Sequence, residues 1–522
     1  MRFRATAFGI LALFLLAVAS GARAQDDNKA QPSSTPNATA SQLPGSQKAG
    51  AAPSRSNTSA SGEARRLPED STTKQSVTVN GRTLSFTATA GSLRLFNQSG
   101  EPQADVAYTA YHLDGTDPRS RPVTFFFNGG PGASSAYLQL GCAGPWRLPI
   151  EGEGATSSAS PELKPNAETW LDFTDMVFVD PVDTGYSRFV SGDGDTHKNF
   201  FTVDGDVNAL AVVIRRYLEK YDRLLSPKFI VGESYGGIRG PKMVRELQTQ
   251  QGVGINGLIL ISPLLDFREF GGTSLLQYAI SLPSMAAIAR EAKHPVTRTD
   301  MADVESYARG EFLADLVKGE ADAEATTRLA DRVSALTGID QAVTRRLAGR
   351  LGISEFRREF DRRDGRVAGR YDGSVLGFDP DPDSSDSHFS DPSGDTLIAP
   401  LTSAAVDLTT RTLKWRPDGP YRLLNRSISW DYGRGINPVQ SNSDLRQILA
   451  LDPKLKLLVG HGLFDLATPY FGSKIQLDQL PAYASADRVK LVVYPGGHMF
   501  YSREASRRAF RTEAEALMKS GE

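Results

Sequence analysis

The chain has 522 residues, of which 40% are hydrophobic, and it carries 59 basic against 61 acidic side chains. This length exceeds a typical single domain, and the apolar content allows a sizeable buried core. A formal net charge of −2 gives no electrostatic reason to expect a nucleic-acid partner, and none is predicted.

The first 24 residues resemble a secretory signal. Arg2 and Arg4 provide a basic start, and residues 8–18 form an apolar run that is short for a membrane span. Ala22-Arg23-Ala24 then has the small-x-small pattern of a cleavage site. We expect residues 1–24 to be a signal peptide cleaved near Ala24, which leaves no membrane attachment. An uncleaved N-terminal anchor is the alternative.

Cys142 is the only cysteine, so no intrachain disulfide is possible. An exported chain without disulfides suits a bacterial periplasm better than a eukaryotic secretory route. We therefore expect a periplasmic or secreted bacterial protein. Cys142 itself either belongs to the core or lines a pocket, and the core is the favoured interpretation.

Residues 25–75 are rich in Ser, Ala, Pro, Gly, Asn and Gln. Such a composition buries too little apolar surface to offset the entropy of ordering, which predicts a disordered low-complexity linker. Order is expected from residue 76, where Asn80-Gly81 favours a type I′ turn between two strands.

Strands and helices then alternate along the chain. Residues 76–268 predict antiparallel strands followed by a strand–helix alternation, which is typical of a parallel sheet with helices on both faces. Residues 269–395 are largely helical in pattern and heavily charged, which indicates an inserted cap with solvated helix faces. Residues 396–522 resume the alternation as the second part of the core.

No cofactor or metal is predicted. The acidic, Pro- and Ser-rich loop at residues 379–395 leaves a calcium site conceivable, but the loop lacks a recognisable ligand spacing.

Gly232-Glu233-Ser234-Tyr235-Gly236 is a G-x-S-x-G motif between a predicted strand and a predicted helix. This is the setting of a nucleophile elbow, a tight turn that exposes a serine hydroxyl beside a helix N-terminus. Ser234 is therefore the candidate nucleophile. The alternative is a glycine-containing turn whose serine has no catalytic role.

A serine nucleophile needs a base, and the chain has six histidines. His498 follows a predicted strand and comes after Ser234 and Asp465 in the order Ser, Asp, His that this kind of site requires. Asp465 would orient the His498 ring. Asp465 could instead be a loop or cap residue, and His461 remains the runner-up base.

The reaction also needs N–H donors for a developing oxyanion. One should come from Tyr235, the residue after the nucleophile, and the other from an early glycine loop, for which Gly130 is the choice. The alternative is a glycine turn that binds no ligand.

Four motifs together resemble the serine carboxypeptidase family. They are Asn-Gly-Gly-Pro-Gly-Ala-Ser-Ser at residues 128–135, Phe-Val-Asp-Pro-Val-Asp-Thr-Gly-Tyr-Ser at 178–187, Gly-Glu-Ser-Tyr-Gly-Gly at 232–237 and Gly-Gly-His-Met at 496–499. The resemblance implies an α/β-hydrolase fold. It also implies a serine-type carboxypeptidase that releases C-terminal residues from peptides through an acyl-enzyme on Ser234, with a free peptide C-terminus as the recognised feature.

The resemblance further implies that Asn128 and Glu233 bind the terminal carboxylate of the substrate, with Phe126 as an apolar wall where the family usually has tryptophan. Two carboxyl groups at close range favour protonation of one of them, which explains activity at acidic pH. Cys142 stands where a glutamate is usual, so the carboxylate site lacks one acid and the pH profile is expected to be less acidic. Ala133 replaces a usual cysteine, as in a disulfide-free chain.

Two other functions remain open. An esterase or acyltransferase could use the same nucleophile and oxyanion loop. A non-catalytic binding protein on this fold is disfavoured because every predicted catalytic residue is present.

Overall fold

The computed structural model describes residues 66–150, 162–190, 194–270, 273–384, 390–433, 438–483, 485 and 487–520. The predicted signal peptide and residues 25–65 of the predicted linker lie outside these residues.

A ten-stranded sheet runs through the described chain in the order β1-β2-β3-β7-β4-β9-β10-β13-β14, with β8 paired to β3. The strands β1 to β3 are antiparallel to one another and β3 is antiparallel to β7, whereas β7 to β14 along this order are parallel. The strands are β1 (Ser71–Val79), β2 (Arg82–Phe96), β3 (Pro102–Leu113), β4 (Val123–Phe127), β7 (Asp175–Val179), β8 (Arg188–Phe189), β9 (Lys228–Glu233), β10 (Gly257–Ile261), β13 (Lys456–Gly462) and β14 (Val489–Tyr494). Two small separate sheets pair β5 (Trp146–Arg147) with β6 (Lys164–Pro165) and β11 (Arg366–Ala368) with β12 (Leu376–Phe378).

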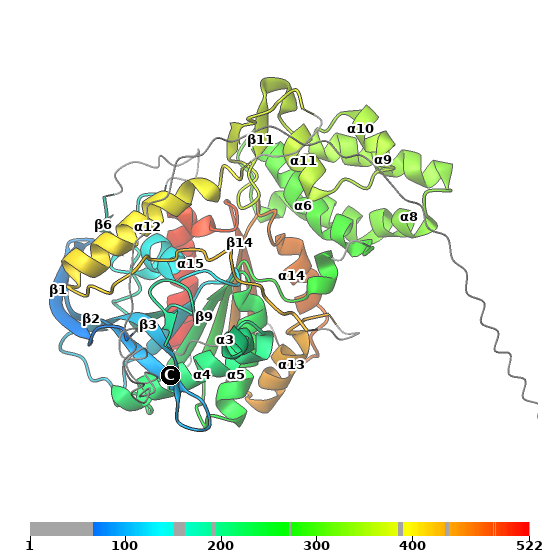
Figure 1. Ribbon diagram of the computed structural model, residues 1–522. Helices are drawn as coiled ribbons and strands as arrows, with labels where there is room; N and C mark the ends of the chain where they lie inside the picture. Colours follow the sequence, from blue (N-terminus) through cyan, green and yellow to red (C-terminus); the bar gives the residue numbers. More distant parts are fainter. Residues whose placement is uncertain are drawn as a thin grey trace, which may run out of the picture. The chain divides into compact units, whose positions relative to one another are not determined.

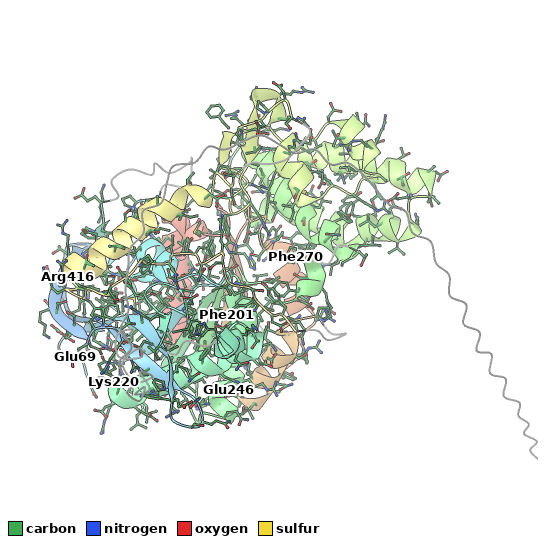
Figure 2. The ribbon with its side chains drawn as sticks, in the orientation of Figure 1. Glu69, Phe201, Lys220, Glu246, Phe270 and Arg416 are labelled. Atoms are coloured by element: carbon green, nitrogen blue, oxygen red, sulfur yellow. The ribbon has the colours of Figure 1, made fainter. Side chains whose placement is uncertain are left out.

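The N-terminal hairpin forms around the predicted turn. Asn80 and Gly81 both have positive φ, 51° and 73°, as a type I′ turn requires. However, β1 begins at Ser71 and pairs with β2 from there, so the predicted linker ends several residues too late. A polar composition does not prevent a strand whose backbone groups are paired along a neighbour. Asp70, just before β1, is also tied down by Lys220 at 2.6 Å, a residue labelled in Figure 2.

Helices pack on both faces of the sheet (Figure 1). They are α2 (Ala136–Leu138), α3 (Gly194–Phe200), α4 (Val203–Lys220), α5 (Gly236–Thr249), α12 (Ile398–Asp407), α13 (Asn442–Leu451), α14 (Tyr470–Leu477) and α15 (Glu504–Lys519). One apolar cluster joins α2, α12 and α15 to one face, and another joins α4, α5 and α13 to the other.

The central strands show why both faces are covered. All five residues of β4 are buried. Phe126 belongs to the first cluster, whereas Phe125 and Phe127 belong to the second. Successive side chains of a strand point to opposite faces, so a continuous apolar run demands packing on both.

The helices between residues 276 and 359 have an apolar cluster of their own. They are α6 (Leu276–Glu291), α7 (Ala302–Tyr307), α8 (Leu313–Lys318), α9 (Ala323–Thr337), α10 (Gln341–Arg346) and α11 (Ile353–Glu359), and α6 and α8 to α11 are grouped in Figure 1. Their apolar cluster extends to Leu463, Phe464 and Leu466, which follow β13. This inserted segment therefore packs against a loop at the carboxyl end of the sheet. No helix among the described residues has the length and apolarity to cross a membrane.

Candidate active site

Ser234 lies in the turn between β9 and α5. Its φ of 60° is in the left-handed region, which is strained for a non-glycine residue and typical of a nucleophile elbow. The turn is held by its own backbone, since the Ser234 N–H donates to Ile261 O at 2.9 Å and its carbonyl accepts from Gly237 N at 2.8 Å. The serine side chain thereby stays partly exposed and lines a pocket.

His498 and Asp465 come together from the loops after β14 and β13. Nδ1 of His498 lies 2.9 Å from Oδ2 of Asp465. The other Asp465 oxygen, Oδ1, accepts the backbone N–H groups of Ala467 and Thr468 at 2.8 and 2.9 Å. An ionised carboxylate only accepts, so the proton of His498 sits on Nδ1 and Nε2 is left as the acceptor.

Ser234 and His498 line the same pocket. Among the described residues no hydrogen bond joins the Ser234 hydroxyl to the ring, a gap that commonly closes only when substrate binds. Burial alone would lower the pKa of His498, but the Asp465 carboxylate, helped by Glu233, raises it above its ordinary value. The structure thus brings the three predicted triad residues to one place with the ring already oriented.

His461, the runner-up base, is placed differently. Its ring is fully buried, and its Nε2 lies 2.8 Å from the hydroxyl of Ser473. Burial lowers its pKa to about 3. It does not line the pocket of Ser234, so the geometry favours His498.

The glycine loop after β4 packs closely against the turn that carries Ser234. A Cβ added to Gly129 would lie 2.5 Å from the Tyr235 nitrogen and 2.9 Å from the Ser234 Cβ, so only glycine fits there. Gly130 follows with a φ of 99° and lines the pocket. Within the described chain, the backbone N–H groups of Gly130 and Tyr235 have no hydrogen-bond partner. Donors that bind an oxyanion are expected to be unpaired in this way before substrate binds.

Asn128 and Glu233 are in direct contact. The Asn128 amide donates to Oε2 of Glu233 at 2.8 Å, and both residues line the pocket beside Ser234. Burial raises the pKa of Glu233 to about 7, against the lowering effects of His498, Tyr501 and Asn128. A carboxyl group of this kind is protonated at mildly acidic pH and could then donate to a substrate carboxylate.

The expectation for Phe126 is corrected. Its ring is fully buried and stacks on Phe178 with 4.5 Å between centroids, close to Trp170. The described pocket lining does not include it, because its position in β4 turns it into the sheet–helix core. Cys142 is buried in the same cluster, and burial raises the pKa of its thiol, as expected for a core cysteine.

A buried ion pair between Arg239 and Asp206 lies next to the site. Arg239 of α5 donates to both carboxylate oxygens of Asp206 at 2.7 and 3.1 Å and to the Asn128 carbonyl at 2.5 Å. Both side chains of the pair are buried. Arg239 therefore connects the helix that follows Ser234 to the loop that carries Asn128.

Replacing Asp206 with alanine should destabilise the fold by about 3–5 kcal/mol, because it leaves the Arg239 charge buried without its partner. Urea unfolding measures this. The matched control is Asp407→Ala in the exposed pair with Arg411, for which the expected change is below about 1 kcal/mol. A comparably small loss for Asp206→Ala would mean that the Asn128 carbonyl and water suffice for Arg239.

Sequence reasoning missed several residues of this site. Tyr371, from the inserted segment, lines the pocket. The centroid of its ring lies 5.0 Å from that of His498, and its backbone carbonyl accepts a hydrogen bond from the backbone N–H of His498 at 2.5 Å. The Thr468 hydroxyl lies 2.8 Å from Asp465 Oδ2 and 3.0 Å from His498 Nδ1. Thr468 could have been found from the sequence because it lies only three residues after Asp465, whereas no sequence signal marks Tyr371. The remaining pocket lining is Gly129, Ala133, Tyr137, Gly394, Asp395, Ile398, Leu424, Arg426 and Met499.

The described residues hold no cluster of three or more His, Cys, Asp or Glu side chains suited to a metal ion. Part of the acidic loop at 379–395, residues 385–389, lies outside them.

Comparison with known proteins places this site in a family context. Residues 84–310 match the family model described as serine carboxypeptidase. The chain is 25% identical over 208 residues to serine carboxypeptidase-like 16 of Arabidopsis thaliana, covering 38% of this chain and 45% of that protein. It is 31% identical over 160 residues to the pheromone-processing carboxypeptidase KEX1 of Saccharomyces cerevisiae, covering 28% of this chain and 20% of that protein. The alignments thus span less than half of these relatives.

The crystal structure of the Saccharomyces cerevisiae prohormone-processing carboxypeptidase superposes with a TM-score of 0.50 at 15% identity, covering 83% of this chain and 91% of that one. At this identity the likeness concerns the fold. Together with the mostly parallel sheet covered on both faces, it confirms the predicted α/β-hydrolase class.

Proposed function

Because residues 84–310 match the family model described as serine carboxypeptidase, we propose that this chain is a serine-type carboxypeptidase. The observation that carries the proposal is the pocket in which Ser234, His498, Asn128 and Glu233 meet. It joins a nucleophile and its base to a pair of side chains that suit a terminal carboxylate.

In the proposed reaction, Oγ of Ser234 attacks the carbonyl carbon of the last peptide bond while Nε2 of His498 accepts its proton. The N–H groups of Gly130 and Tyr235 bind the oxyanion. His498 then gives the proton to the leaving amine, which releases the C-terminal residue. Water hydrolyses the acyl-enzyme with the same histidine as base. Asp465 keeps the ring in its tautomer throughout.

The pH dependence follows from two groups. His498 must be neutral to act as base, so activity falls as the pH drops below its raised pKa. Glu233 must be protonated to donate a hydrogen bond to a substrate carboxylate, so binding weakens above about pH 7. His498 and Glu233 interact electrostatically, so the two apparent pKa values that limit the bell-shaped profile belong to the pair and not to either residue alone.

The test compares a blocked dipeptide with a free C-terminus and its C-terminal amide from pH 4 to 8. We expect a bell-shaped kcat/KM for the free acid, and for the amide a much lower kcat/KM without the alkaline limb. Glu233→Gln should remove that limb for the free acid as well. Equal cleavage of both substrates, or cleavage of esters alone, would refute the exopeptidase and favour an esterase or acyltransferase on the same site.

Two features outside the pocket belong to the same proposal. Tyr371, Gly394 and Asp395 come from residues 269–395 and line the pocket, which supports a cap role for that segment. The basic start and apolar run of residues 1–24 support export to a bacterial periplasm or the medium. N-terminal sequencing of the exported chain tests the cleavage site.

A further inference from the structure

Glu233 receives two hydrogen bonds on one oxygen. The Asn128 amide and the Tyr501 hydroxyl both donate to Oε2, at 2.8 and 2.9 Å. Within the described chain Oε1 has no hydrogen-bond donor, although Glu233 lines the pocket. The two oxygens of one carboxyl group therefore have different environments.

Tyr501 is built into this position. It lies in the 3₁₀ turn Phe500–Ser502, three residues after His498, and is buried behind the pocket rather than lining it. Its ring packs against Gly141, where an added Cβ would come within 2.9 Å of the ring. The next residue, Cys142, stands where the resemblance leads one to expect an acid. The chain thus has a phenol donor and a buried thiol near Glu233 instead of a second carboxyl group.

The charged and titratable groups that act on Glu233 come from several elements. They are His498, Asp465, Tyr501, Cys142, Tyr137 and Tyr371. Tyr501 is the one among them that donates a hydrogen bond to the carboxyl group. Burial and the Glu233 charge raise the pKa values of Cys142 and Tyr501 well above their usual range, so both stay protonated while Glu233 titrates.

We propose that Tyr501 is a positioning residue of the carboxylate site, and that it takes the part of the acid that the resemblance implies at position 142. With Asn128 it holds Oε2 of Glu233 as an acceptor, so the titrating proton resides on Oε1 and is directed at the terminal carboxylate of the substrate. This inference rests on the proposed function. A carboxyl–carboxyl pair would share a proton between two acids, whereas a phenol of high pKa donates at every working pH.

Loss of the hydroxyl has a defined consequence. A hydrogen bond to a carboxylate stabilises its charged form, so Tyr501→Phe should raise the pKa of Glu233. Protonated Glu233 then persists to higher pH. The alkaline limb of kcat/KM for the free-acid dipeptide should move up by about one pH unit, so the ratio of activity at pH 8 to that at pH 5 rises up to about tenfold. The ring, and with it the packing on Gly141, is retained.

The experiment measures these profiles for wild type, Tyr501→Phe, Glu233→Gln and the double variant. The matched control is Tyr470→Phe, because Tyr470 is also buried and donates to a glutamate, Glu305, at 3.0 Å away from the pocket lining. We expect a shift for Tyr501→Phe alone, none for Tyr470→Phe, and no further effect of Tyr501→Phe once Glu233 is glutamine.

The outcomes separate the two claims. An unmoved limb in Tyr501→Phe, with wild type still preferring the free acid, would overturn the role of Tyr501 and leave the carboxypeptidase standing. A shift that persists in the Glu233→Gln background would show that Tyr501 acts elsewhere. A wild type without preference for the free acid would remove both proposals.

Discussion

Replacing Ser234 with alanine is expected to lower kcat by about a million-fold, since loss of the nucleophile alone removes nearly everything that a triad contributes. The loss should be the same for peptide and ester substrates, because both require attack by the same oxygen. The fold should be unaffected, since the hydrogen bonds that hold the elbow are made by the Ser234 backbone. Steady-state kinetics and fluorophosphonate labelling followed by mass spectrometry measure the effect.

The control is Ser334→Ala in α9 of the inserted segment, whose hydroxyl donates to a nearby carbonyl and which should change the rate by no more than about twofold. Wild-type protein that takes up no fluorophosphonate at Ser234 would revive a non-catalytic binding protein. Retained hydrolysis in Ser234→Ala would place the nucleophile elsewhere.

Replacing Asp465 with asparagine is expected to lower kcat by about 10⁴-fold through the wrong tautomer of His498. Two backbone N–H groups point at Oδ1, so the amide oxygen of an asparagine should stay there and its NH₂ should face Nδ1. A donor opposite Nδ1 forces the ring proton onto Nε2. Nε2 can then no longer accept the proton of Ser234. Loss of the negative charge should also lower the pKa of His498, because Asp465 raises it.

The comparison for this prediction is His461→Gln, a buried histidine outside the pocket lining. It should retain most of the activity, and the residual activity of Asp465→Asn should extend to lower pH than that of wild type. Near-complete loss in His461→Gln together with a mild effect of Asp465→Asn would exchange the roles of the two histidines.

The residues predicted for the triad lie together in the structure for a shared physical reason. Ser234, Asp465 and His498 each follow an apolar run that forms a strand, and the parallel strands β9, β13 and β14 carry them to one edge of the sheet. Local sequence is informative here because a buried strand, a glycine turn and a following helix are dictated over a few residues. Chain order then supplied the pairing of acid and base.

The predictions that disagreed concern positions decided by packing. The resemblance implies that Phe126 forms an apolar wall of the carboxylate site, but the alternation of β4 turns it into the core. The polar composition predicts a linker up to residue 75, because polar residues give no sign of the backbone pairing with β2 that begins at Ser71. In both cases a contact made far along the chain outweighed the local pattern.

The sequence by itself determined the class of fold, the turn that carries Ser234 and the glycine loop beside it, because each depends on short-range backbone geometry and strand order. Only the tertiary structure decided that Tyr371 reaches His498 from the inserted segment, that Arg239 ties α5 to Asn128, and that Tyr501 donates to Glu233. These contacts join residues 127, 111 and 268 positions apart. Their existence depends on how separate elements pack, which no local pattern of residues encodes.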